Sequence, residues 1–130
     1  MLSFSGLLVL IVDDNSKRAT ATAQLVRVLG SIPVIAATEP VAAKALPNVD
    51  LVIACAEALG GRAINVLHAA RAHRRILRVL STSRDLVSQR GVADLLVREP
   101  FTVVALGDLL AKAHARQRAT NASAPSPAPL

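Results

Sequence analysis

Short runs of apolar residues alternate along the chain with stretches in which apolar residues recur at helical spacing. The clearest run, residues 7–12, is apolar at six consecutive positions and is followed by Asp13, Asp14 and Asn15. A continuous apolar run that ends in polar residues indicates a strand buried on both faces, with a loop after it. Further strands are predicted at residues 33–36, 51–55, 76–80 and 94–97.

Helices are predicted between these strands. Residues 17–29 carry Ala21, Leu25, Val28 and Leu29 at helical spacing, with Ser16 as the expected N-cap and Gly30 as the closing residue. Three more helices are predicted at residues 39–46 after Thr38, 62–73 and 84–89. Thr102 caps a last helix that ends near Arg116, with an apolar stripe formed by Val103, Leu106, Leu110 and Ala113.

This alternation of five strands and five helices predicts an α/β fold, a five-stranded parallel sheet with helices on both faces. In such folds ligands bind at the carboxyl ends of the strands. The chain of 130 residues is long enough for one domain, which we place at residues 1–118. Residues 119–130 contain only Ala, Thr, Asn, Ser, Pro and one Leu, so we expect a disordered tail or an interdomain linker.

Composition restricts the class of protein. The chain contains two Phe and no Tyr or Trp, so its core must be aliphatic, and its single Cys cannot form an internal disulfide. We therefore expect a protein of the reducing cytoplasm. The longest apolar stretch, residues 1–12, is shorter than the ~20 residues that cross a bilayer, so no membrane contact is expected. No catalytic motif is present, and we expect no enzyme activity of this chain.

The formal net charge is +6, and its distribution is uneven. Eight arginines lie between Arg62 and Arg98, against only Asp85 and Asp94, so this segment carries the whole excess. Such a bias favours an acidic partner, whether protein, nucleotide or nucleic acid. The alternative is a solvated, arginine-rich surface without a partner.

Three short motifs resemble a known family. They are Gly-x-x-Val-Leu-Ile-Val-Asp-Asp-Asn-x-x-Arg from Gly6 to Arg18, Leu29-Gly30, and Glu99-Pro100-Phe101. In this order they resemble the receiver domains of two-component signalling, specifically those of hybrid histidine kinases, over about residues 6–116. The resemblance implies the flavodoxin-like (βα)5 receiver fold. It also implies an acidic pair for Mg2+, an acceptor Asp, a Ser or Thr, a Lys before a cis-proline, and an aromatic switch residue.

Only part of that set is present. Asp13 and Asp14 match the acidic pair, and Ser81 matches the hydroxyl position, with Thr82 as the alternative if the register slips by one residue. Three positions depart from the family, because the acceptor position holds Cys55, the lysine position Glu99 and the switch position Leu96. A thiol beside carboxylates resists ionisation, and Glu99 reverses a charge at a site built for an anion. The sequence therefore predicts a degenerate receiver, a pseudo-receiver.

The role of the remaining acidic residues stays open at this stage. Asp13 and Asp14 could hold Mg2+ weakly with Glu99 as a third carboxylate, or cap the following helix, or pair with Arg98 or Lys17. Glu57 belongs to the same rim. We expect an acidic rim at the strand ends, arginine-rich patches on the third and fourth predicted helices and their connections, and a cis peptide between Glu99 and Pro100.

The resemblance implies a regulatory domain that docks onto a histidine kinase, onto neighbouring domains of the same protein, or onto a second copy of itself. Arg84, Arg90 and Arg98 are the candidate partner-binding residues. No DNA partner is expected. One alternative is a sensor of an anionic second messenger such as cyclic di-GMP, although the aromatic residues that stack on guanine are missing. Another is an atypical receiver that still accepts a phosphoryl group.

Overall fold

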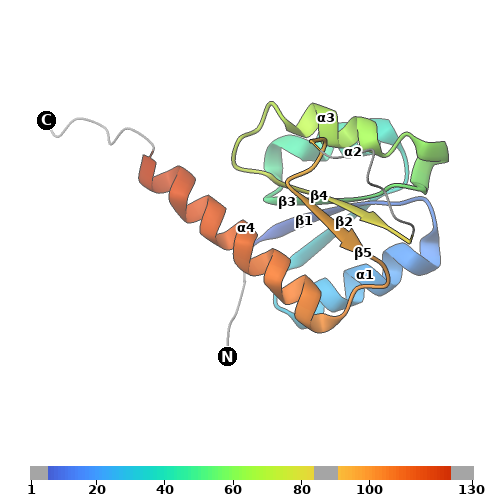
Figure 1. The fold of residues 1–130 in the computed structure, drawn as a ribbon, viewed down its shortest axis with the longest axis horizontal. Helices are drawn as coiled ribbons and strands as arrows, with labels where there is room; N and C mark the ends of the chain where they lie inside the picture. Colours follow the sequence, from blue (N-terminus) through green and yellow to red (C-terminus); the bar gives the residue numbers. More distant parts are fainter. Residues whose placement is uncertain (1–5, 84–90, 124–130) are drawn as a thin grey trace, which may run out of the picture.

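A five-stranded parallel sheet forms the centre of the computed structural model, which describes residues 6–83 and 91–123 (Figure 1). The strands lie in the order β2-β1-β3-β4-β5, and every neighbouring pair is parallel. Their bounds are β1 Leu8–Val12, β2 Ile32–Ala36, β3 Leu51–Cys55, β4 Leu77–Thr82 and β5 Leu95–Arg98. All five predicted strands are present, and the predicted fold class is confirmed.

Helices cover both faces of the sheet (Figure 1). One face carries α1, Ser16–Val28, and α4, Val103–Ser123. The other carries α2, Glu39–Ala45, and α3, Ile64–Ala70, with the short 3-10 turns η1, Leu46–Asn48, and η2, Ala58–Gly61. The helix predicted at residues 84–89 lies outside the described residues.

The two cores explain why the strands are apolar at every position. In β1, Val9 and Ile11 pack toward α1 and α4, whereas Leu10 and Val12 pack toward α2 and α3. All four side chains are at most 2% exposed. Successive strand residues point to opposite faces, so a strand between two helical layers needs apolar side chains throughout.

Helix α1 departs from its predicted packing. The stripe predicted at Ala21, Leu25, Val28 and Leu29 is correct only in part. Leu25 and Leu29 are partly buried against the core, whereas Ala21 is exposed and Val28 is 76% exposed. The buried face consists of Ala19, Thr22, Ala23 and Val26. The N-cap is Asn15 rather than Ser16, because the Asn15 side chain accepts a hydrogen bond from the Arg18 N–H at 3.0 Å. Gly30 does close the helix, with φ of 90°.

Helix α4 begins as predicted but is longer. The Thr102 hydroxyl accepts from the Ala105 N–H at 3.0 Å, which confirms Thr102 as the cap. The predicted stripe needs one correction, because Val103 is 48% exposed and Leu109 is buried instead. The helix continues beyond Arg116 to Ser123, so residues 119–123 of the predicted tail are helical and α4 projects beyond the sheet (Figure 1). The first proline of the tail, Pro125, follows two residues later.

Helix α3 is shorter than the predicted span of residues 62–73. Gly60 and Gly61 adopt positive φ angles in η2, so the chain is still turning where the helix was expected to start. Among the described residues, no helix is both long and apolar enough to cross a membrane.

Candidate functional site

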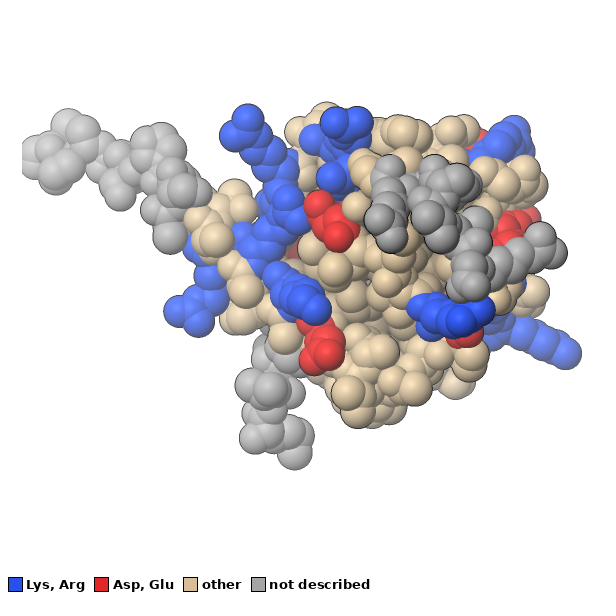
Figure 2. Space-filling view, viewed as in Figure 1, with Lys and Arg blue, Asp and Glu red and all other residues tan. Residues whose placement is uncertain are grey.

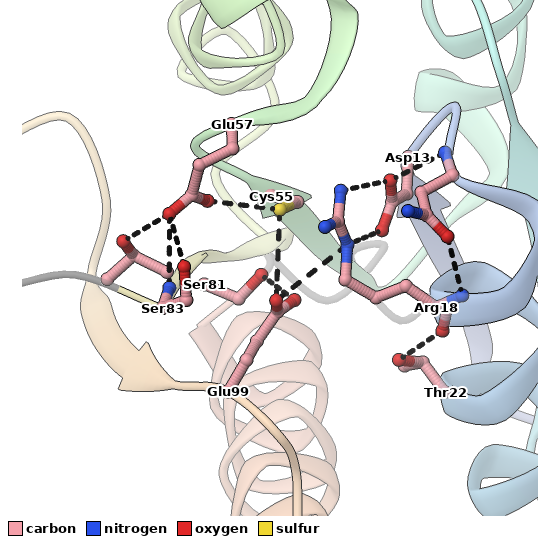
Figure 3. Close-up of polar contacts among 10 residues, drawn as sticks. Asp13, Arg18, Thr22, Cys55, Glu57, Ser81, Ser83 and Glu99 are labelled. Atoms are coloured by element: carbon pink, nitrogen blue, oxygen red, sulfur yellow. Dashed lines mark hydrogen bonds and ion pairs between the residues drawn. The ribbon is translucent and has the colours of Figure 1, made fainter.

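The carboxyl ends of four strands bring together side chains that are distant in the sequence (Figure 3). Asp13 follows β1, Cys55 ends β3, Ser81 lies in β4, and Glu99 follows β5. Cys55 and Ser81 are direct partners in the parallel register. Parallel strands end at one edge of the sheet, so the topology alone collects these residues. We call this group, with Arg18 and Glu57, the carboxyl-edge cluster.

Asp13 is held by an arginine that the sequence analysis did not assign to the site. Its two carboxylate oxygens accept hydrogen bonds from Nε and a terminal nitrogen of Arg18 at 2.6 and 2.7 Å. The Asp13 side chain is 4% exposed and that of Arg18 31%. The bidentate contact with Asp13 raises the pKa of the Arg18 guanidinium. The predicted pairing of Asp13 with Arg98 or Lys17 is therefore replaced by a local pair with Arg18.

The same arginine approaches the carboxylate of Glu99. Arg18 Nε lies 3.8 Å from Glu99 Oε2, and the other oxygen of Glu99 accepts a hydrogen bond from the Ser81 hydroxyl at 2.8 Å. Figure 3 shows Arg18 and Ser81 directed toward Glu99 from the α1 side and from β4. The carboxylate at the position where the family has a lysine is thus held by a hydroxyl and a cation of the chain itself.

Cys55 lies between two carboxylates. Its thiol donates to Glu57 Oε2 at 3.3 Å and faces Glu99 Oε2 at 3.9 Å. Burial raises the pKa of the Cys55 thiol to about 12, and the neighbouring carboxylates of Glu57 and Glu99 act in the same direction. At neutral pH the group is a protonated thiol, which is a poor nucleophile.

Glu57 collects several donors from the end of β4. Its Oε1 accepts from the Thr82 hydroxyl at 3.0 Å, and from the Ser83 N–H and hydroxyl at 3.1 and 3.0 Å. Burial acts to raise the pKa of Glu57, but the hydrogen bonds from Cys55, Ser83 and Thr82 outweigh it and lower the pKa to about 2. Ser81 and Thr82, the two candidates for the hydroxyl position, therefore serve different carboxylates.

Other predicted site residues lie apart from this cluster. Asp14 is exposed, and Leu96, at the switch position, is 43% exposed on β5. Arg98 is exposed at the end of β5, opposite Thr82 in the register. Arg84 and Arg90 lie outside the described residues. The peptide between Glu99 and Pro100 is cis, as expected.

The donor set of the cluster is poorly matched to Mg2+. Ligand atoms of Asp13, Cys55 and Glu99 lie within 4.8 Å of one another, a spacing that could hold a metal ion. Mg2+, however, requires oxygen ligands in octahedral geometry, and one of these three atoms is sulfur. Both Asp13 oxygens already bind Arg18, and Asp14 is not part of the set. Metal binding by Asp13 and Asp14 remains an untested prediction.

A cleft of about 350 Å3 opens beside the cluster, between α1 and the segment that joins β5 to α4. Ala21, Leu25 and Phe101 line it, and Arg18 and Glu99 contribute its charged groups. Two residues of the predicted stripe, the exposed Ala21 and the partly buried Leu25, thus line a surface cleft.

The sequence matches no protein-family model and no curated protein. Comparison with solved structures finds a response regulator receiver domain protein from Methanospirillum hungatei, with a TM-score of 0.74 and 19% identity over 87% of this chain and 98% of that one. A receiver domain protein from Clostridium thermocellum gives 0.74 and 17%, over 88% and 98% of the two chains.

A third similar structure is the response regulator TrrA from Thermotoga maritima, solved in complex with Mg2+ and BeF. It has a TM-score of 0.72 and 21% identity over 82% of this chain and 98% of that one. Each of these chains is covered almost completely, and the strand order is the flavodoxin-like 2-1-3-4-5. The chain has the fold of response regulator receiver domains.

Proposed function

We propose that the chain is a pseudo-receiver domain of a two-component signalling protein of the hybrid histidine kinase type. In this proposal it regulates its partners by docking and does not accept a phosphoryl group. The observation that carries the proposal is the closed carboxyl-edge cluster. In it the thiol of Cys55, at the acceptor position, contacts Glu57 and Glu99, and the carboxylate of Glu99, at the lysine position, is bound by Ser81.

The acceptor position supports the first part of the proposal. Phosphoryl transfer needs a nucleophile that is ionised and accessible, whereas Cys55 is 2% exposed and its thiol donates to Glu57. Its pKa near 12 keeps the thiolate scarce at physiological pH.

The charges around Cys55 independently support the proposal that the chain does not accept a phosphoryl group. A transferring phosphoryl group needs cations on its oxygens. Here it would meet the carboxylates of Glu57 and Glu99, which lie 3.3 and 3.9 Å from the sulfur of Cys55. Arg18, the one cation in the cluster, is already bound to Asp13 through two nitrogens. The similar structure of TrrA holds Mg2+ and BeF, and we infer that this chain lacks the equivalent site.

The direct test is phosphorylation. The full chain is incubated with Mg2+ and either acetyl phosphate or a phosphorylated histidine kinase, and its intact mass is measured. We expect no change, while a receiver with an aspartate acceptor gains one phosphoryl group under the same conditions. A stoichiometric gain by this chain contradicts the proposal, and loss of that gain in Cys55→Ala would assign it to the thiol.

Docking is tested with the predicted partner-binding residues. The variant Arg84→Glu/Arg90→Glu should slow association with the kinase or neighbouring domain and leave the Tm nearly unchanged. The matched control Arg27→Glu/Lys44→Glu makes the same charge change on exposed positions of α1 and α2. Equal association rates for both variants would refute a docking role of Arg84 and Arg90.

A further inference from the structure

A second charged region lies at the opposite edge of the sheet from the carboxyl-edge cluster. Residues 71–78 lead from α3 into β4, and residues 112–118 belong to the half of α4 that returns to the amino ends of the strands. Figure 2 shows lysine and arginine side chains gathered over this side of the molecule, around α4. We call this region the basic face: Arg71, Arg74, Arg75, Arg78, Lys112, Arg116 and Arg118.

The basic face gathers nearly half of the lysines and arginines of the chain. Two of its seven cations, Arg78 and Arg116, share the carboxylate of Asp94. The formal net charge of the 130 residues is +6, and these seven are among the 15 lysines and arginines that produce it. Four arginines of the segment between Arg62 and Arg98 thus lie beside three cations of α4, a helix that is distant in the sequence.

Specific contacts hold the two segments together. Arg116 Nε donates to the Arg74 carbonyl at 3.0 Å, and Gln117 donates to the Arg75 carbonyl at 3.1 Å. Asp94, just before β5, accepts from Arg78 at 3.2 Å and from Arg116 at 2.8 Å. These bonds bring like charges together and fix them, although their mutual repulsion opposes this arrangement.

Most of this charge is available to a partner. Arg71, Arg74, Lys112 and Arg118 are exposed, and within the described part of the chain none of them forms an ion pair with a carboxylate. Guanidinium groups bind phosphate and carboxylate oxygens in a bidentate manner, and six of the seven cations are arginines.

The surroundings of these cations distinguish between classes of partner. A protein interface is usually centred on buried apolar or aromatic anchors. Among the described residues, the large exposed apolar side chains all lie outside residues 71–78 and 112–118; they are Val28, Ile32, Ile35, Val41, Leu96, Val103 and Val104. A face made of charge alone suits a partner whose contact surface is charged throughout. The phosphate backbone of a nucleic acid has this property.

The lack of aromatic residues on the basic face favours double-stranded over single-stranded nucleic acid. Proteins that bind single strands stack the bases on aromatic side chains, and the basic face contains none. A duplex presents its phosphates without exposing the faces of its bases, so arginines are sufficient to bind it.

We infer that the basic face binds the phosphate backbone of double-stranded nucleic acid without reading its sequence. The sequence predicts no DNA partner, but in the structure α4 lies against residues 71–78 and adds its cations to theirs. It goes beyond the proposed function and is independent of it, since the two regions occupy opposite edges of the sheet.

The test is a binding titration of the full chain with a labelled DNA duplex of about two helical turns and arbitrary sequence, followed by fluorescence anisotropy. If four cations each neutralise one phosphate, the logarithm of the association constant falls against the logarithm of salt with a slope of about −4. Affinity should then fall on the order of a hundredfold between about 50 and 200 mM salt. Two duplexes of unrelated sequence should bind equally.

Charge reversal locates the contact. Arg71→Glu/Arg74→Glu should weaken binding at least about tenfold and reduce the salt slope by about 2. The control Lys17→Glu/Lys44→Glu makes the same change in net charge on exposed positions of α1 and α2. Circular dichroism and Tm measurements establish that both variants fold. Arg71→Gln/Arg74→Gln, which removes the two charges without reversing them, provides a second variant with a smaller expected loss of affinity.

Several outcomes overturn the inference. One is the absence of wild-type binding at about 50 mM salt, and another is an equal loss of affinity in the reversal and control variants, which would mean that net charge alone is responsible. Tighter binding to a polyglutamate peptide, or to phosphatidylserine vesicles, than to the duplex would assign the face to a different partner. Preserved duplex binding in Arg71→Glu/Arg74→Glu would exclude this surface.

Discussion

The charged side chains at the two edges of the sheet differ in whether the chain itself supplies their partners. At the carboxyl edge, Asp13, Glu57 and Glu99 are each bound by donors of the chain itself. At the amino edge, Arg78 and Arg116 share the carboxylate of Asp94, and several other cations of the basic face are exposed without an ion pair in the described structure. The first region is closed by internal contacts, and the second is open to a partner. In this chain the polar residues at the usual ligand-binding edge of the sheet are bonded to one another.

The two edges also contain ion pairs of different burial. Asp13 is almost fully buried, so removal of Arg18 would leave a carboxylate without solvent or a counter-ion. Arg116 and Asp94 have side chains that are 35% and 22% exposed, so water can replace either partner. Substitutions at these two pairs should therefore differ in effect although the contact distances are similar.

The largest expected effect is that of Arg18→Met. This variant keeps an apolar stem but leaves Asp13 unpaired, and we expect a loss of about 2 to 3 kcal/mol in the free energy of unfolding. Urea unfolding followed by circular dichroism measures it.

The matched double variant Arg18→Met/Asp13→Asn removes the stranded charge and should recover much of that loss. A loss below about 0.5 kcal/mol in Arg18→Met would show that the pair contributes no more than a surface pair, and the comparison between the two edges would fail.

A second effect concerns alkaline pH. The pKa of Cys55 is about 12 in the folded chain and 9.0 ordinarily, so ionisation favours the unfolded state between these values. The contribution of Cys55 is fully present below pH 9 and is lost as the pH rises toward 12. Urea unfolding over this range should show a smaller decline in stability for Cys55→Ala than for the wild type. Equal declines would mean that the thiol ionises normally in the folded protein.

Acid pH should act through Glu57 in the opposite direction. Its pKa is about 2 in the folded chain and 4.5 ordinarily, so its contribution to stability is present above pH 4.5 and is lost as the pH falls toward 2. In Glu57→Gln the decline of stability over this range should be shallower. If Glu57→Gln and the wild type lose stability in parallel, the hydrogen bonds from Thr82 and Ser83 do not hold the carboxylate ionised.

The smallest effect is expected at the basic face. Arg116→Met breaks the contact with Asp94, which keeps its bond from Arg78, and should reduce the free energy of unfolding by less than about 1 kcal/mol. The same urea experiment used for Arg18→Met measures it. A loss as large as that of Arg18→Met would show that both edges depend equally on their ion pairs.

Much of the fold could be predicted because the strands are continuous apolar runs that end in polar residues. The phase of α1 could not, since two sets of positions follow helical spacing and the set that packs on the sheet contains the smaller residues Ala19, Thr22 and Ala23. Small side chains allow close packing of a helix on a sheet, but they carry a weak hydrophobic signal.

The site was predicted as a set of positions but not as a network. Asp13, Cys55, Ser81 and Glu99 were predicted to lie together because each is at the carboxyl end of a strand, and parallel strands end at the same edge of the sheet. The pairing of Arg18 with Asp13 depends on how the loop after β1 turns into α1, which the pattern of residues does not specify. The basic face was missed for a related reason, since three of its seven cations come from a helix more than thirty residues away in the sequence, as in the contact between Arg116 and Arg74.

The most direct test of the closed carboxyl edge is a two-dimensional NMR titration of the labelled chain with beryllofluoride in the presence of Mg2+, with Mg2+ alone as the reference. We expect the amide resonances of Asp13, Cys55, Ser81 and Glu99 to keep their reference positions, because the thiol of Cys55 is protonated and Arg18, the cation of the cluster, is bound to Asp13. A saturable shift of these resonances on addition of beryllofluoride would show a working receiver site and would contradict the account.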